Sequence, residues 1–267
     1  MEKKFKLGVI GAGFMSNAII NGVLKSKNIG NNDILVSDVN ELALNKLALL
    51  GIEGTTDNNK VYENCEYVLL AIKPQNFKEI EDGSIKCVKK VISIMAGVNK
   101  AKIKQKFVGA KVVRCMPNTP VSVEFGAVGV DCSDFDAEND VLFVKNLFSS
   151  VAKVVAVEEN KLSAVTGVSG SSPAYFYLFV KSLIDAGVKN GLTPLEAENL
   201  VVATMRGSAE MIASKGDKEI SDLINAVCSK GGTTIEAMKV FESRELSSIV
   251  AEAVSACINR ANELENL

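Results

Sequence analysis

Two glycines stand where a short apolar run gives way to an amphipathic segment near the start of the chain. The apolar run is Leu7–Ile10, Gly11 and Gly13 follow it, and Ala18–Leu24 has helical spacing. Glycine lets a backbone approach a pyrophosphate, and the N–H groups that open the following helix favour an anion. The pattern predicts a dinucleotide site, although Ser16 replaces the third glycine of G-x-G-x-x-G. The alternative is an ordinary strand-to-helix turn that merely needs glycine.

A second cluster of small residues, Ser229–Thr234, interrupts helical patterning just before another helix is expected. Gly231 and Gly232 remove side-chain bulk from the start of that helix. Its N–H groups and threonine hydroxyls can then hold a carboxylate. The same residues also fit a plain loop with a helix N-cap, so both interpretations stay open from spacing alone. A similar small-residue interruption, Ser169–Pro173, comes earlier.

The chain has no histidine, which restricts its chemistry. Ser-His-Asp hydrolysis is excluded, and so are dehydrogenases that depend on a histidine base. Six cysteines are scattered without a C-x-x-C pair, so we expect reduced thiols, no disulfide and no metal site. Any reaction must use lysine, carboxylate, hydroxyl or backbone groups, or need little acid–base help from the protein.

Composition narrows the class of protein. The chain has 267 residues, 47% of them hydrophobic and 23% charged, with a net charge of −2. This balance predicts a globular protein with a substantial core, and the absence of a basic block argues against nucleic-acid binding. We see no secretory signal and no apolar run of about 18 residues, so we expect a cytoplasmic protein that does not span a membrane.

Strand and helix patterns divide the chain in two. Alternating strands and helices in the first part predict an α/β fold with a mostly parallel, doubly wound sheet. The expected strands are Leu7–Ile10, Ile34–Ser37, Tyr67–Ile72, Val91–Met95, Lys111–Arg114, Ala127–Val130 and Ala152–Ala156. The second part is expected to be all helical, with helices at Pro173–Asn190, Pro194–Ser214 and Ser247–Glu265. Capping boxes are expected at Thr193–Glu196 and Thr233–Glu236. We place the domains at 1–158 and 159–267.

Several motifs, in order along the chain, resemble those of the pyrroline-5-carboxylate reductase family. They run from residue 7 to residue 241 and are Gly11–Met15, Ala71–Pro74, Ala96–Val98, Met116–Pro120, Val168–Tyr175 and Gly231–Ile235. The resemblance implies a Rossmann domain followed by a helical dimerisation domain. It also implies reduction of 1-pyrroline-5-carboxylate to L-proline with NADPH or NADH, the final step of proline biosynthesis. Members form homodimers through interleaved helices, and many assemble further, commonly into decamers.

The resemblance also implies which residues bind the cofactor. The pyrophosphate turn and the loop after a central strand supply most of them, with further residues near the adenosine ribose and the nicotinamide. Met116–Pro120 would form a rigid wall of the active site or, alternatively, a proline-fixed turn that ends a strand. Lys73 is expected to orient the cofactor rather than transfer a proton. The implied cofactor residues are Ile10, Gly11, Ala12, Gly13, Phe14, Met15, Ser37, Asp38, Asn58, Ala71, Ile72, Lys73, Pro74, Ala96 and Gly97.

For the substrate, the resemblance points to the second glycine cluster. Backbone N–H groups there would hold the pyrroline carboxylate, and the Thr234 hydroxyl would hydrogen-bond the ring nitrogen. Thr234 is the expected catalytic residue. The implied substrate residues are Glu159, Ser229, Gly231, Gly232, Thr233 and Thr234.

Two residues complicate the cofactor prediction. Asp38 stands where an acidic side chain usually binds the ribose hydroxyls of NAD and repels the 2′-phosphate of NADP, whereas Ser37 can accept a phosphate if Asp38 points away. Phe14 occupies a position where many relatives have a polar residue. Two other classes share part of the pattern: a hydroxyacid or opine-type dehydrogenase that uses a lysine for acid–base work, and a dinucleotide sensor without catalysis.

Overall fold

The computed structural model describes residues 4–27, 29–80 and 82–266. The chain packs into two compact units. The sheet unit contains the residues up to Ser171 and those from Cys257 onward, and the helical unit is Ser172–Ala256. The sheet unit is therefore discontinuous in sequence. These packing units do not coincide with the sequence domains 1–158 and 159–267, which stay a prediction.

One eight-stranded sheet organises the sheet unit, with the order β3-β2-β1-β4-β5-β6-β7-β8. Among the strand pairs of the described residues, only β6–β7 is antiparallel. After β3 the chain crosses to the other side of β1, so the strand order reverses between β1 and β4, as the sequence predicted for a doubly wound fold. The strands are β1 Phe5–Ile10, β2 Ile34–Ser37, β3 Glu53–Thr55, β4 Cys65–Leu70, β5 Lys90–Ser93, β6 Lys111–Pro117, β7 Gly126–Asp131 and β8 Ala152–Ala156.

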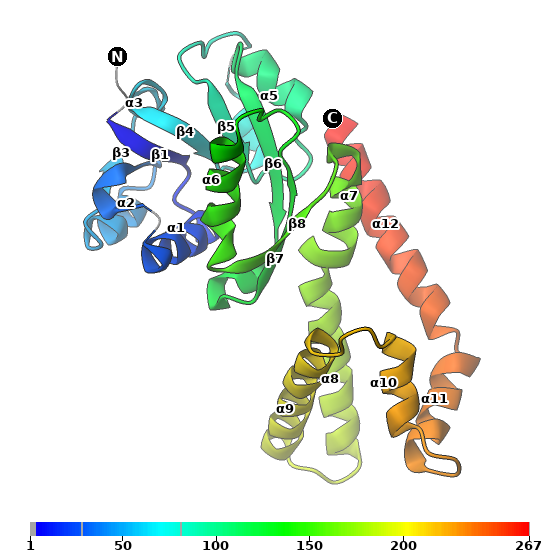
Figure 1. The fold of residues 1–267 in the computed structure, drawn as a ribbon. Helices are drawn as coiled ribbons and strands as arrows, with labels where there is room; N and C mark the ends of the chain where they lie inside the picture. The colour runs from blue at the N-terminus through cyan, green and yellow to red at the C-terminus, as the bar shows by residue number, and fades with distance from the viewer. Residues whose placement is uncertain (1–3, 28, 81, 267) are drawn as a thin grey trace. The chain divides into compact units, whose positions relative to one another are not determined.

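The central strands are apolar on both sides because helices cover both faces of the sheet. In β4, Tyr67 and Leu69 pack into one core cluster, and Val68 and Leu70 pack into the other. Side chains of α1, α2 and α6 complete the first cluster, and those of α3, α4 and α5 complete the second. Figure 1 shows the helices of this unit packed around the sheet. The helices of this unit are α1 Phe14–Ser26, α2 Glu41–Ala48, α3 Asn58–Asn64, α4 Pro74–Lys78, α5 Lys100–Lys106, α6 Glu138–Ser149 and α7 Leu162–Val165.

The helical unit contains no strand among its described residues, as predicted. Its helices are α8 Ser172–Lys189, α9 Pro194–Ala213, α10 Ile220–Val227 and α11 Thr233–Ser243. A final helix, α12 Leu246–Asn266, begins in this unit and ends in the sheet unit. None of the helices in the described part of the chain is long and apolar enough to cross a membrane.

One of the two predicted capping boxes forms. At α9 the Thr193 N–H donates to Glu196 Oε2 at 2.8 Å, and the Glu196 N–H donates back to Thr193 Oγ1 at 3.3 Å. The box predicted at Thr233–Glu236 is wrong, because Gly232 is the N-cap of α11 and Thr233 is already the first helical residue. Glu236 instead pairs with Lys239 one turn later, at 2.7 Å.

Candidate active site

The turn between β1 and α1 leaves open space at Gly13, where the helix begins. Gly11 has a φ of +103°, and a Cβ built there would lie 2.8 Å from the carbonyl oxygen of Ala71. Gly13 is the N-cap of α1 and no side chain caps that helix. A Cβ at Gly13 would meet no atom within 4 Å. The first turn of α1 thus presents its N–H groups beside open space, the arrangement that binds phosphate in dinucleotide folds.

The residues predicted near the adenosine ribose lie next to this turn. The Ala12 N–H donates to Asp38 Oδ2 at 2.6 Å, and the Asn40 N–H donates to Asp38 Oδ1 at 2.8 Å. The Ser37 hydroxyl is buried and donates to Asn58 Oδ1 at 2.6 Å. The Asp38 carboxylate is therefore directed at the glycine turn, and the neighbouring hydroxyl already has a partner.

The loop after β4 forms the other side of the glycine turn. The Ala71 N–H donates to the Ile10 carbonyl at 2.9 Å, which holds this loop against the end of β1. Lys73 is the N-cap of α4 and exposed, and Pro74 fills the first helical position. Phe14 opens α1 with 63% of its surface exposed, and Met15 beside it is half-buried. Lys73 makes no ion pair with the described residues and is exposed, so it lacks the environment of a proton-transfer group.

Ala96 and Gly97, predicted near the nicotinamide, follow β5. Gly97 has a φ of +69°, and a Cβ there would lie 2.9 Å from Leu264 Cβ in α12. The glycine turn follows β1, Ser37 ends β2 and Asp38 comes next, and the Ala71–Pro74 loop follows β4. The turn at Ala96 and Gly97 follows β5. Because these strands are parallel, their carboxyl ends lie at one edge of the sheet, where doubly wound folds bind ligands. Asn58 is brought there through its contact with Ser37.

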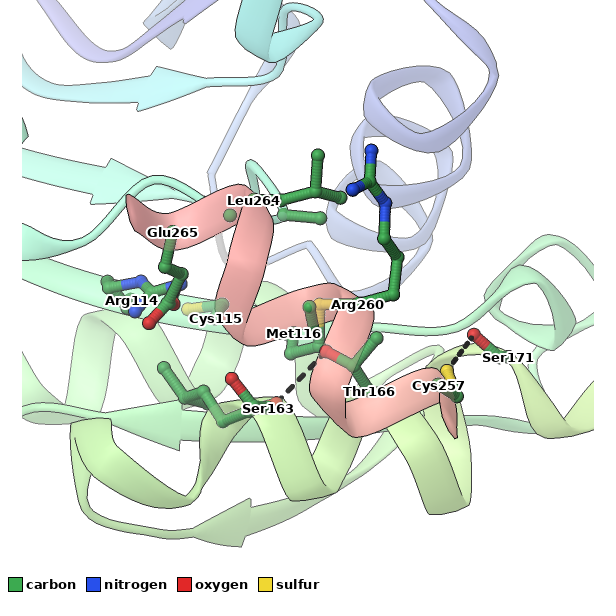
Figure 2. A pocket seen from close by; sticks show the side chains of 14 residues that line it. Arg114, Cys115, Met116, Ser163, Thr166, Ser171, Cys257, Arg260, Leu264 and Glu265 are labelled. Atoms are coloured by element: carbon green, nitrogen blue, oxygen red, sulfur yellow. Dashed lines mark hydrogen bonds and ion pairs between the residues drawn. The ribbon is translucent and has the colours of Figure 1, made fainter. Parts of the chain in front are cut away.

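A cavity of about 260 Å³ lies in the sheet unit beside Ala96 and Gly97 (Figure 2). Strand β6 forms one side, the segment around α7 a second, and the end of α12 a third. Burial raises the pKa of the Cys115 thiol well above its usual range, so that lining thiol stays protonated at neutral pH. The residues that line the cavity are Ala96, Gly97, Arg114, Cys115, Met116, Leu162, Ser163, Thr166, Ser171, Cys257, Arg260, Ala261, Leu264 and Glu265.

Two sequence motifs meet at this cavity. A turn of π-helix, Thr166–Gly170, follows α7, and the Ser171 N–H donates to the Thr166 carbonyl at 2.9 Å. The Asn118 amide donates to Ser169 Oγ at 3.4 Å and accepts from the Ala127 N–H at 2.9 Å. Asn118 thereby joins the Met116–Pro120 motif to the small-residue segment. Irregular helical turns of this kind often mark functional positions.

Three charged side chains line the cavity, Arg114, Arg260 and Glu265, and Glu159 pairs with one of them. Sequence reasoning identified only Glu159. Glu159 Oε1 accepts from the Lys100 N–H at 2.7 Å and pairs with Arg114 Nη1 at 3.3 Å. The second guanidinium nitrogen of Arg114 pairs with Glu265 Oε1 at 2.6 Å. The sequence signal for Arg114 was weak, because it ends the predicted strand Lys111–Arg114, whose first residue is also charged. Its pairing with Glu265, far along the chain, was not readable from spacing.

The remaining predicted substrate residues come together in the helical unit, in the turn before α11. Gly231 has a φ of +76°, and the Gly232 N–H donates to the Ser229 carbonyl at 3.0 Å. No side chain caps α11, and Thr233 and Thr234 are exposed at its first two positions. The structure thus forms two groups of predicted residues: the five of this turn, and Glu159 with the cofactor residues in the sheet unit.

Comparison with known proteins identifies the family. A family model described as pyrroline-5-carboxylate reductase dimerisation matches residues 159–264, and one described as NADP oxidoreductase, coenzyme F420-dependent, matches residues 6–97. The pyrroline-5-carboxylate reductase of Haemophilus influenzae is 35% identical over 267 residues, 98% of each chain. That of Synechocystis is 34% identical over 264 residues, 97% of this chain and 98% of the relative.

Solved structures agree over the full length. A pyrroline-5-carboxylate reductase from Coxiella burnetii has a TM-score of 0.86 and 31% identity, covering 98% of this chain and 99% of that one. The pyrroline carboxylate reductase of Plasmodium falciparum, crystallised with NADP bound, has a TM-score of 0.86 and 28% identity, covering 99% of this chain and all of that one (100%). The chain therefore belongs to the pyrroline-5-carboxylate reductase family.

Proposed function

We propose that this protein reduces 1-pyrroline-5-carboxylate to L-proline with a hydride from NAD(P)H, the last step of proline biosynthesis. The observation that carries this proposal is the glycine turn at the β1–β4 strand reversal, in a chain that matches reductases of this name from end to end. The open space at Gly13 and the uncapped start of α1 fit a pyrophosphate. When bound there, NAD(P)H supplies the hydride.

The roles of the protein's own residues follow from their chemistry. The N–H groups at the start of α11 hold the substrate carboxylate, and the Thr234 hydroxyl hydrogen-bonds the ring nitrogen. The hydride adds to the imine carbon, and the proton on the imine nitrogen makes that carbon electrophilic. Since the substrate carries this proton itself, a chain without histidine can catalyse the reaction by positioning its reactants.

The direct test is oxidation of NADH and NADPH by the purified protein, measured in parallel with and without 1-pyrroline-5-carboxylate. The expected result is rapid oxidation only when substrate is present, with L-proline as the product. If neither cofactor is oxidised, the proposed activity is wrong and the dehydrogenase and sensor alternatives gain support.

The geometry at Asp38 favours NADH over NADPH. Both carboxylate oxygens of Asp38 accept backbone N–H groups beside the glycine turn, so its charge is fixed where the 2′-phosphate of NADPH would approach. Ser37 already donates its hydroxyl to Asn58. We expect Asp38→Ser to lower the ratio of kcat/KM for NADH to that for NADPH by about tenfold.

Glu41→Gln is a matched control for this variant, since Glu41 is an exposed carboxylate in the first turn of the neighbouring helix α2. It should change the cofactor ratio by less than about twofold, because exposed charges are screened by salt. An unchanged ratio in Asp38→Ser would remove Asp38 from cofactor discrimination.

The enzyme works as a homodimer in the cytoplasm. Exposed apolar side chains on the helical unit, such as Phe176, Leu178, Ile249 and Val250, favour association, because exposed apolar patches are typical of protein interfaces. The match to a dimerisation model over 159–264 supports the same conclusion. The mass in solution, measured by light scattering, tests it: a dimer is the smallest expected species, and the family resemblance predicts further assembly to a decamer.

A further inference from the structure

The buried Arg114 side chain lies at the centre of a partly exposed network of charges, in which Glu159 is 33% and Glu265 23% exposed. Only 6% of the Arg114 side chain is exposed, and its two terminal nitrogens bind different carboxylates, Glu159 at 3.3 Å and Glu265 at 2.6 Å. Glu159 also accepts the N–H of Lys100, the first residue of α5. A planar guanidinium holds two carboxylates in directions fixed by its rigid fork of donors, whereas a lysine ammonium is a rotatable point charge. Arg114 therefore ties β6 to α5 and to the end of α12.

The end of α12 is also the part of that helix that contacts the predicted nicotinamide turn. Gly97 and Leu264 approach so closely that a Cβ on Gly97 would lie 2.9 Å from Leu264 Cβ. Leu264 lines the cavity beside Ala96 and Gly97, and Glu265 comes next in sequence. Figure 2 shows Arg114 beside Glu265, with Leu264 on the same turn of α12.

We propose that Arg114 and Glu265 are positioning residues for hydride transfer, because their ion pair fixes Leu264 as a wall of the cavity next to Gly97. This inference rests on the proposed function, since it takes Ala96 and Gly97 as the nicotinamide end of the cofactor site. Neither side chain has to touch a reacting atom. A small displacement of a wall can lower a rate severalfold or more, because hydride transfer depends on the distance and angle between the reactants.

The test uses Glu265→Gln, which keeps the shape of the side chain and removes its charge. Arg114 keeps Glu159 as a partner in this variant, so we expect the protein to fold. We expect kcat to fall about fivefold and the affinity for NAD(P)H, measured by fluorescence titration, to change less than about twofold. The deuterium isotope effect on kcat, measured with cofactor deuterated at the transferred position, should rise because hydride transfer becomes rate-limiting. A purely structural role would not raise it.

Three further variants make the test specific. Glu265→Asp retains the charge and should recover part of the lost kcat, and Leu264→Ala should reproduce the loss while leaving the ion pair intact. Glu263→Gln is the matched control: Glu263 lies on the same turn, 62% of its side chain is exposed, and it pairs with Arg260 in the same helix. It should have the kcat and isotope effect of the original protein.

Different results would contradict the proposed function and the positioning role of Glu265. If the unaltered protein does not oxidise NAD(P)H with 1-pyrroline-5-carboxylate, the proposed function is wrong. If the unaltered protein is active and folded Glu265→Gln has unchanged kcat and isotope effect, the positioning role is wrong and the proposed function stands. A loss of kcat that follows only a loss of folded protein, measured by circular dichroism, would also overturn the positioning role.

Discussion

Replacing Gly11 by alanine is expected to lower the free energy of unfolding by about 3 kcal/mol, as well as weakening cofactor binding. Two effects add at this position. The φ of +103° is strained for any residue with a Cβ, and that Cβ would lie 2.8 Å from the backbone carbonyl oxygen of Ala71. Because backbone cannot rotate away as a side chain can, β1 and the Ala71–Pro74 loop would have to separate. Denaturant unfolding monitored by circular dichroism measures the loss.

Gly13→Ala tests the proposed position of the cofactor with little expected effect on stability. Gly13 has a φ of −78°, and an added Cβ meets no atom within 4 Å. We expect the free energy of unfolding to change by less than about 1 kcal/mol. Cofactor affinity should nevertheless fall by more than about tenfold, because the methyl group occupies the space proposed for the pyrophosphate. Unchanged affinity in Gly13→Ala would contradict the position assigned to the cofactor.

Gly83→Ala separates backbone strain from contact. Gly83 has a φ of +71° with no atom within 4 Å of an added Cβ. The free energy of unfolding of Gly83→Ala should fall by about 1 kcal/mol, because backbone strain is the only cost of the added Cβ. The difference between Gly11→Ala and Gly83→Ala then gives the cost of the contact with Ala71 together with the greater strain at a φ of +103°.

The second large effect is expected at Thr234, where alanine should lower turnover by more than about tenfold with cofactor affinity almost intact. Thr234 is exposed at the second position of α11, so removing its hydroxyl should leave folding undisturbed. The physical reason is the proposed hydrogen bond to the ring nitrogen, which orients the imine for the hydride. Steady-state kinetics at saturating cofactor, together with a separate cofactor titration, measures both quantities.

Thr234→Ser and Thr234→Val test whether the hydroxyl group of Thr234 or the shape of its side chain supports turnover. Serine keeps the hydroxyl and should keep most of the turnover, whereas valine keeps the shape without the hydroxyl and should behave like alanine. Turnover that is unchanged in both alanine and valine variants would remove Thr234 from the mechanism and leave the N–H groups of α11 as the proposed substrate contacts.

Features encoded by neighbouring residues were readable from the sequence. The β1 strand, the glycine turn and α1 are consecutive, and each has a strong local signal, so their type and order were predicted correctly. The α9 start was predicted because both partners of its capping box lie within one turn. The edge strand β3 was missed because it has three residues, a glycine at its centre and no buried side chain. α10 was missed although Ile220, Leu223, Ile224 and Val227 have helical spacing.

Features that depend on distant parts of the chain could not be predicted. The Thr233 capping box was wrong for a local reason instead: Gly231 has a positive φ and the adjacent Gly232 caps α11. The direction of the Asp38 carboxylate depends on the Ala12 N–H, which only the pairing of β1 with β2 brings near. The Arg114–Glu265 pair joins a central strand to the final helix.

The discontinuity of the sheet unit has a consequence for the order in which the protein is made. The ribosome delivers α12 after every other described element, so the sheet and its glycine turn can form while Leu264 and Glu265 are still absent. A nascent chain at that stage has the proposed phosphate-binding turn complete but one wall of the cavity missing. At that stage one of the two terminal nitrogens of Arg114 lacks its partner, Glu265. The arrival of α12 is therefore the step that adds Leu264 and Glu265 to the lining of the cavity.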